Sequence, residues 1–265
     1  MFRRCVQTLI GKLGCTLAPK DSYPPPCETA HSQGYDLESE AVPAIQLVRS
    51  YTMLTYPRLV TLYQQVVYCE NHGIEGDFVE CGTWKGGAVG IMALANLKWG
   101  AARRDIHLFD SFEGVPEPDQ SVDGEEAVRF ARAAGGGVEG KLVPLEGAYE
   151  SVGTLEVNRT LLEQVIGYDK GHLHYHRGWF QDTLPTDAHD INRIAILRLD
   201  GDWYSSTKIC LEYLYGKIVR GGFVIIDDYN YCVGCRKAVD EFMAKESIHA
   251  FLNHIDSPAR YWIKP

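Results

Sequence analysis

A chain of 265 residues, 45% of them hydrophobic, is long enough to bury a full core, and we expect one large domain. The net charge of −9 argues against nonspecific binding to nucleic acid or to an anionic membrane, because both require a basic surface. No apolar run reaches the roughly 18 to 20 residues that cross a bilayer. Together with eight cysteines in no repeating framework, this predicts a soluble, cytoplasmic protein.

Residues 1–42 show no clear periodicity and contain three prolines in a row, so we expect an N-terminal arm or extension there. Gly11, Lys12 and Gly14 interrupt what would be the apolar core of a signal peptide. Weak contact with a membrane surface is the less favoured interpretation of this arm.

From residue 57 onward, predicted strands alternate with predicted helices. Strands are expected at 76–82, 106–111, 172–176, 194–199 and 221–227, and helices at 57–73, 90–99, 124–134, 151–166, 204–218 and 235–245. The segments 112–126 and 178–185 are expected to be exposed loops, and 250–256 and 259–265 a final hairpin. This alternation predicts an α/β fold with a mostly parallel sheet, which binds ligands at the carboxyl ends of its strands.

A glycine-rich turn follows the first strand, in FVECGTWKGGA. Gly82, Gly86 and Gly87 let a ligand approach the backbone, and the next helix offers free N–H groups. A dinucleotide-binding turn would read GxGxxG. Glu80 instead repels a pyrophosphate and attracts a sulfonium, which favours S-adenosylmethionine (SAM). The alternative is a tight turn that binds no ligand.

Two further strand ends carry candidate cofactor contacts. Asp110, in FDSFEG, can accept hydrogen bonds from a ribose diol, or it can cap the turn that follows. Trp179, in RGWFQDTLP, can lie against an adenine, or it can hold the next helix onto the core.

Four acids follow the fourth and fifth strands: Asp200 and Asp202, then Asp227 and Asp228. Alternating side-chain direction would send Asp200 and Asp202 to the same side. Crowded carboxylates are costly unless a cation or proton neutralises them, and Mg²⁺ prefers oxygen ligands. The pattern therefore predicts a magnesium site that activates a hydroxyl. The alternative is that some of these acids cap helices, Asp202 foremost.

Two other patterns have plain interpretations that we prefer. His172, His174 and His176 alternate along the third predicted strand. They could bind a metal together, but no carboxylate or cysteine lies nearby to join them. We therefore interpret them as a polar face of the strand. Cys232 and Cys235 lack the second ligand pair of a zinc site and are expected near the start of a helix.

Several long motifs, in this order, resemble the TylF/MycF-type sugar O-methyltransferases over roughly residues 45–265: YTMLTYPRL, GDFVECGTWKGGA, LFDSFEGVPEPD, GWFQDTLP, LRLDGDWYSST and GGFVIIDDY. The resemblance implies a class I SAM-dependent methyltransferase fold, a Rossmann-like, mostly parallel sheet of seven strands with a terminal antiparallel hairpin. The methyltransferase domain would be residues 43–265, with a lid loop near 112–140. SAM and Mg²⁺ would serve the methylation of a sugar hydroxyl on a glycosylated natural product or polysaccharide, and a homo-oligomer is compatible with this.

The resemblance also implies a role for each matching residue. Asp200 would be the general base, and Asp202, Asp227 and Asp228 the metal ligands. The cofactor would be held by Glu80, Gly82, Thr83, Trp84, Lys85, Gly86, Gly87, Asp110, Ser111, Phe112, Ser151, Gly178 and Trp179.

Two other functions remain open at this point. A NAD-dependent oxidoreductase would keep the Rossmann-like sheet, but Glu80 and the missing GxGxxG speak against it. A catalytically silent SAM-binding scaffold would have no reason to keep four crowded acids.

Overall fold

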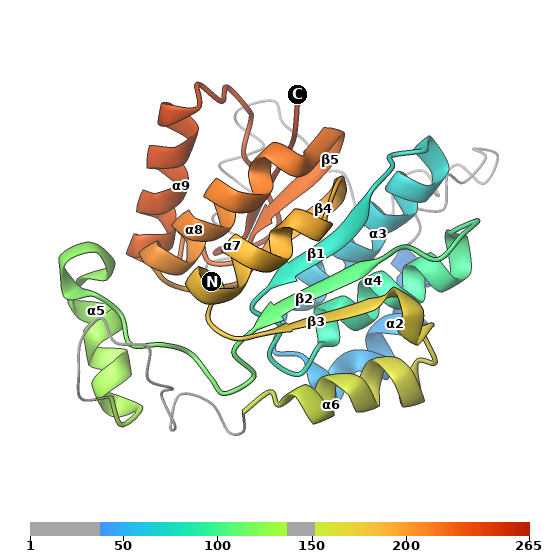
Figure 1. The fold of residues 1–265 in the computed structure, drawn as a ribbon, viewed down its shortest axis with the longest axis horizontal. Coiled ribbons are helices and arrows are strands. Elements are labelled where there is room, and N and C mark those ends of the chain that lie inside the picture. Colours follow the sequence, from blue (N-terminus) through green and yellow to red (C-terminus); the bar gives the residue numbers. More distant parts are fainter. Residues whose placement is uncertain (1–37, 137–151) are drawn as a thin grey trace, which may run out of the picture. The chain divides into compact units, whose positions relative to one another are not determined.

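The computed structural model describes residues 38–136 and 152–265, which contain one sheet of seven strands in the order β3-β2-β1-β4-β5-β7-β6 (Figure 1). Strands β1 to β5 are parallel, and β7 runs antiparallel to both β5 and β6. The predicted architecture is confirmed. The strands are β1 (Asp77–Cys81), β2 (Ile106–Asp110), β3 (Leu173–Arg177), β4 (Ile194–Leu199), β5 (Ile218–Ile226), β6 (Asn253–His254) and β7 (Arg260–Ile263).

Helices cover both faces of this sheet (Figure 1). One face carries α2 (Glu38–Val48), α3 (Tyr56–His72), α4 (Gly87–Trp99) and α6 (Leu155–Arg159), which continues into the π-helical segment η3 (Thr160–Val165). The other carries α7 (Phe180–Asp187), α8 (Tyr204–Leu214) and α9 (Val233–Lys245), and α5 (Gln120–Ala133) packs against α9. The described residues also form short 3-10 helices between these elements, namely η2 (Arg49–Tyr51), η4 (Lys170–His172), η5 (Ala188–Asp190) and η6 (Tyr215–Lys217).

Alternation along the central strands divides the core in two. In β1, Phe78 is buried under the α3–α4 layer, whereas Val79 and Cys81 are buried under the α7–α9 layer. Because both faces are covered, the strands are apolar almost throughout, as parallel strands are. Any charged side chain in these strands therefore needs a partner inside the protein.

The segment 178–185 is not a loop, which corrects our expectation. Residues from Phe180 onward form α7, in which Thr183 and Leu184 are buried. Pro185 and the polar residues suggested a loop, but Pro185 stands near the end of this eight-residue helix, and packing of Leu184 stabilises the turns before it.

The segment 112–126 is also less exposed than expected, and α5 begins at Gln120, four residues before the predicted start. Glu117 and Asp123 are buried. Trp203 Nε1 donates to the carbonyl oxygen of Pro116 at 2.7 Å, which ties the segment to the start of α8.

Three expectations concern the ends of the described segments. Helix α2 begins at Glu38, inside the predicted arm 1–42, and its Ala41 is fully buried. The rest of that arm and the part of the predicted lid between 137 and 140 lie outside the described residues. Within the described residues, no helix is long and apolar enough to span a bilayer.

Candidate active site

A cleft opens at the carboxyl ends of the strands, with about 990 Å³ of space that is partly open to solvent. Residues after β1, β2, β3 and β4 contribute to its wall, as expected for an open parallel sheet. Its lining consists of Met53, Gly82, Trp84, Asp110, Ser111, Gly114, Val115, Pro116, Val152, Gly153, Gly178, Trp179, Phe180, Gln181, Asp200, Gly201, Asp202, Ser205 and Ser206.

Asp110 organises the glycine-rich turn on one side of this cleft. Its Oδ2 accepts hydrogen bonds from the backbone N–H groups of Thr83 at 2.6 Å and Trp84 at 3.2 Å, and from the Thr83 hydroxyl. Its Oδ1 accepts from the N–H of Phe112 at 2.7 Å. Burial raises the pKa of Asp110, and these donors oppose the shift. Asp110 thus caps the turn and also lines the cleft, so the two sequence interpretations are compatible.

A glycine is required at position 82, because the backbone of Asp200 approaches it closely. The φ of Gly82 is +87°, and a Cβ at this position would overlap the carbonyl oxygen of Asp200. This contact brings the glycine-rich turn of β1 directly against the acidic end of β4.

We therefore expect Gly82→Ala to lower the free energy of unfolding by about 3 kcal/mol, from the positive φ and the overlap together. Urea unfolding measures this. Gly73→Ala is the matched control, because Gly73 has a φ of +64° with nothing within 4 Å of the added Cβ, and we expect about 1 kcal/mol there. Equal losses in the two variants would contradict the close-approach argument.

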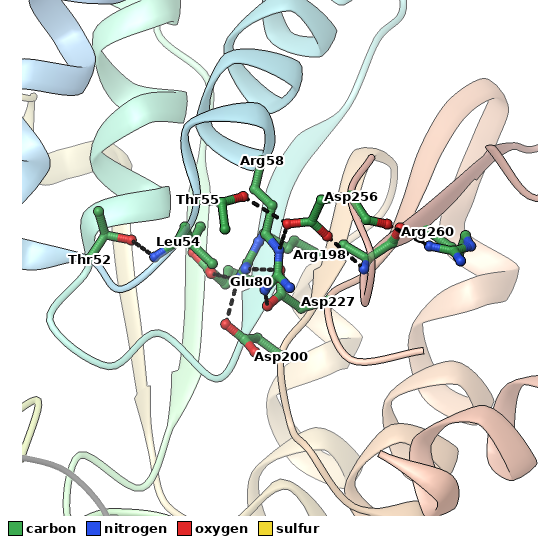
Figure 2. A network of polar contacts seen from close by, with 11 residues as sticks. Thr52, Leu54, Thr55, Arg58, Glu80, Arg198, Asp200, Asp227, Asp256 and Arg260 are labelled. Atoms are coloured by element: carbon green, nitrogen blue, oxygen red, sulfur yellow. Dashed lines mark hydrogen bonds and ion pairs between the residues drawn. The ribbon is translucent and has the colours of Figure 1, made fainter. Parts of the chain in front are cut away.

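Arg198 lies among three acids at the end of the sheet (Figure 2). Its guanidinium pairs with Glu80, with Asp200 Oδ2 at 2.9 Å and with Asp227 Oδ1 at 2.5 Å, and its side chain is only 3% exposed. Glu80 and Arg198 are register partners of β1 and β4, so their side chains meet on one face. Burial raises the pKa of Glu80 to about 8, and Arg198 opposes the shift.

A second arginine joins this network from α3 (Figure 2). Arg58 pairs with Asp227 Oδ2 and, through Nε at 2.8 Å, with Asp256 Oδ2. Both oxygens of Asp227 therefore contact a guanidinium. Asp256 also accepts from the Thr55 hydroxyl at 2.7 Å, which links the start of α3 to the β6–β7 turn.

The remaining acids cluster beside this network. Ligand atoms of Asp200, Asp227 and Asp228 lie within 4.8 Å of one another, and Asp202 forms a similar group with Asp228 and Cys232. Burial, together with the charge of Asp200, raises the pKa of Asp202 to about 8 and of Asp227 to about 6, and Arg198 opposes the shift at Asp227. Burial and the neighbouring carboxylates also raise the pKa of Asp228.

The route by which Asp202 reaches this cluster differs from our expectation. Strand β4 ends at Leu199, and Asp202 has a φ of +55°, so strand alternation does not place it. Asp202 does not cap α8 either, because Trp203 stands at the N-cap and the N–H of Tyr204 donates to Asp123 Oδ1 at 2.7 Å. This leaves the Asp202 carboxylate at the cleft.

The predicted cofactor residues fall into two sets. Those that line the cleft are Gly82, Trp84, Asp110, Ser111, Gly178 and Trp179. Those that lie outside the lining are Glu80, Thr83, Lys85, Gly86, Gly87 and Phe112. Glu80 is buried against Arg198, so its charge meets a guanidinium and not the cleft. Ser151 lies outside the described residues.

These motifs and their arrangement can be compared with known proteins. Residues 29–264 match the macrocin-O-methyltransferase (TylF) family.

The chain belongs to the TylF family of O-methyltransferases.

Individual relatives of this TylF-family enzyme agree with the assignment. It is 35% identical to demethyldecarbamoylnovobiocin O-methyltransferase of Streptomyces niveus over 80% of this chain and 75% of the relative. It is 33% identical to mycinamicin III 3''-O-methyltransferase of Micromonospora griseorubida over 80% of this chain and 78% of that one.

Solved structures confirm the class I SAM-dependent methyltransferase fold. The O-methyltransferase NovP superposes with a TM-score of 0.66 at 33% identity, over 81% of this chain and 82% of NovP. The calicheamicin methyltransferase CalS11, at 17% identity and a TM-score of 0.56 over 86% of this chain and 93% of its own, supports the fold alone.

Our sequence analysis missed residues of this TylF-family enzyme both beside the cleft and in its lining. Arg198 and Arg58 neutralise the acids, and an arginine inside the apolar run IAILRL was a usable signal, because a buried charge requires a partner. Met53, Gly153 and Gln181 also line the cleft. Met53 and Gln181 lie within the motifs YTMLTYPRL and GWFQDTLP, but nothing in those motifs singled them out.

The three alternating histidines do have carboxylates nearby, which corrects the premise of our interpretation. His172 ends η4, and His174 and His176 lie in β3. His172 Nδ1 and His174 Nε2 lie 2.9 and 3.0 Å from Asp105 Oδ1, and His176 Nδ1 lies 2.8 Å from Asp187 Oδ2. Among the described residues, the groups that could hold a metal ion do not include these histidines.

Proposed function

We propose that this enzyme transfers a methyl group from SAM to a sugar hydroxyl of a glycosylated natural product, with Mg²⁺ bound at the acidic strand ends. The observation that carries the proposal is the shared cleft. Gly82 and Asp110, from the glycine-rich turn and the end of β2, line the same cleft as Asp200 and Asp202. A cofactor and an acceptor bound there would lie side by side.

The cofactor is proposed to bind along the strand ends of β1, β2 and β3. Asp110 would receive the ribose, and Trp179 would lie against the adenine. Gly82 and Trp84 would face the methionine part, with Thr83, Lys85, Gly86 and Gly87 supporting the turn. Ser111, Phe112, Gly178 and, from the sequence alone, Ser151 complete the proposed set.

The acid cluster has the donors that a magnesium ion needs. Asp228 Oδ2 is buried and receives no hydrogen bond, and carboxylate oxygens are the preferred ligands of this ion. Asp202, Asp227 and Asp228 are the proposed ligands. Asp228 belongs to both groups of neighbouring ligand atoms, and Asp227 would have to give up a guanidinium contact to bind the ion. When bound, Mg²⁺ would lower the pKa of a coordinated hydroxyl.

Asp200 is the proposed general base. Its carboxylate lines the cleft, and Arg198 holds its Oδ2 at 2.9 Å. That contact restrains the orientation of the carboxylate. Asp200 would accept the hydroxyl proton as the methyl group is transferred.

The acceptor class is supported by the relatives, which are named for demethyldecarbamoylnovobiocin, for mycinamicin III and for a rhamnosyl-bearing tetracenomycin C. Demethyldecarbamoylnovobiocin and mycinamicin III are therefore the first acceptors to test, each beside its aglycone. The scaffold alternative predicts SAM binding without turnover of any acceptor. Membership of a methyltransferase family speaks against the NAD-dependent alternative.

Chelation tests the metal. We expect EDTA to abolish turnover and leave SAM affinity within about twofold, because Asp110 and the glycine-rich turn contain none of the proposed ligands. Isothermal titration measures the affinity, and added Mg²⁺ should restore turnover. Unchanged turnover after exhaustive chelation would defeat the role of the metal.

A further inference from the structure

A thiol lies in the acid cluster, where we had expected only a cysteine near a helix start. Ligand atoms of Cys232, Asp202 and Asp228 lie within 4.8 Å of one another. Cys232 stands at the N-cap of α9, and its N–H donates to the carbonyl oxygen of Asp228 at 2.9 Å. This tight turn folds the cysteine back towards the carboxylate four residues before it.

The second observation is the state of Asp228 itself. The residue is 8% exposed, and its Oδ2 is buried without a hydrogen-bond donor. Asp200 is its neighbour in the acid cluster, and an ionised carboxylate can only accept hydrogen bonds. A buried carboxylate oxygen with no donor is costly, and a cation would offset that cost.

We propose that Cys232, Asp202 and Asp228 form a binding site for a thiophilic divalent cation of the Zn²⁺, Co²⁺ and Cd²⁺ class. One thiolate and two carboxylates make a three-ligand set of the kind that Zn²⁺ accepts, with water in the fourth position. Asp202 lines the cleft, so that position is open to solvent.

The thiol must lose its proton when such an ion binds. Burial and the charges of Asp202 and Asp228 raise the pKa of Cys232, so the free protein holds the thiol form. A coordinated thiol is deprotonated outright, and its proton leaves to solvent. Mg²⁺ gains little from sulfur, so this ligand favours thiophilic ions selectively.

The site shares Asp202 and Asp228 with the proposed magnesium site, and its effect on catalysis rests on that proposed function. A thiophilic ion bound there would exclude Mg²⁺ and place a different Lewis acid in the cleft. The binding itself depends only on the three side chains.

Cobalt provides the test, because Co²⁺ bound to a thiolate absorbs in the near ultraviolet by charge transfer from sulfur. We expect one equivalent of Co²⁺ to produce this band in the metal-stripped full chain and Zn²⁺ to abolish it. In Cys232→Ser the band should be absent, and Zn²⁺ affinity should fall at least about tenfold.

Cys235→Ser is the matched control, because Cys235 is a buried cysteine three residues away and belongs to neither ligand group. It should keep the band. A band that persists in Cys232→Ser, or no band in the unaltered protein, would overturn the inference. If EDTA leaves turnover unchanged but the cobalt band is present, the magnesium proposal is wrong and the inference about Cys232 stands.

Discussion

The Arg198→Met variant is expected to lose about 3 to 5 kcal/mol of unfolding free energy, the cost of removing one partner from a buried ion network. Methionine fills most of the volume but leaves Glu80, Asp200 and Asp227 without their shared cation. Three carboxylates would then crowd together at the end of the sheet. Urea unfolding at neutral pH measures the loss.

Arg193→Met is the control for this variant, because Arg193 also pairs with a glutamate but on the surface, where the two side chains are 63% and 71% exposed. Exposed pairs contribute at most about 1 kcal/mol. Adding Glu80→Gln to Arg198→Met should recover part of the loss, since one unpaired charge is gone. A loss in Arg198→Met no larger than in Arg193→Met would contradict the account of the network.

Asp200→Asn is expected to lower kcat by about 10² to 10⁴, the range typical of a lost general base. The amide keeps the shape of the side chain, and its oxygen can still accept from Arg198. It cannot take the acceptor proton. SAM affinity should stay within about twofold of the unaltered enzyme, and isothermal titration together with methyl transfer to the best acceptor measures both quantities.

Asp190→Asn is the matched control, because Asp190 is exposed in η5 and lies outside the cleft lining. Its kcat should be unchanged. Turnover by Asp200→Asn at the level of this control would sink the assignment of the base. A parallel loss of SAM affinity would instead indicate that the Asp200 side chain also supports cofactor binding in the shared cleft.

Local patterns were sufficient for the framework of the fold. The apolar run IAILRL predicted a buried strand at 194–199, and β4 spans Ile194–Leu199. The segment 178–185 was mispredicted as a loop, because its proline and polar residues favour loops locally. The segment 112–126 is a loop only up to Asp119 and is less exposed than its prolines and acids suggested. Contacts made by Pro116 with Trp203 and by Leu184 with the core outweigh that preference.

The sequence by itself determined which chemistry gathers at the strand ends: a glycine-rich turn after β1, an aspartate after β2 and four acids after β4 and β5. It could do so because strand ends and turns are local features. Only the tertiary structure decided how the charges pair. Glu80 and Arg198 are 118 residues apart in the chain, and the register of β1 with β4 brings them together.

The same holds for Arg58, which reaches Asp227 across 169 residues, and for Cys232, which a turn directs towards Asp202. Such pairings depend on register, crossovers and turns, which no short stretch of sequence specifies. The sequence therefore determined the types of groups at the strand ends. The packing of the sheet decided which acids pair with a guanidinium and which lie beside the Cys232 thiol.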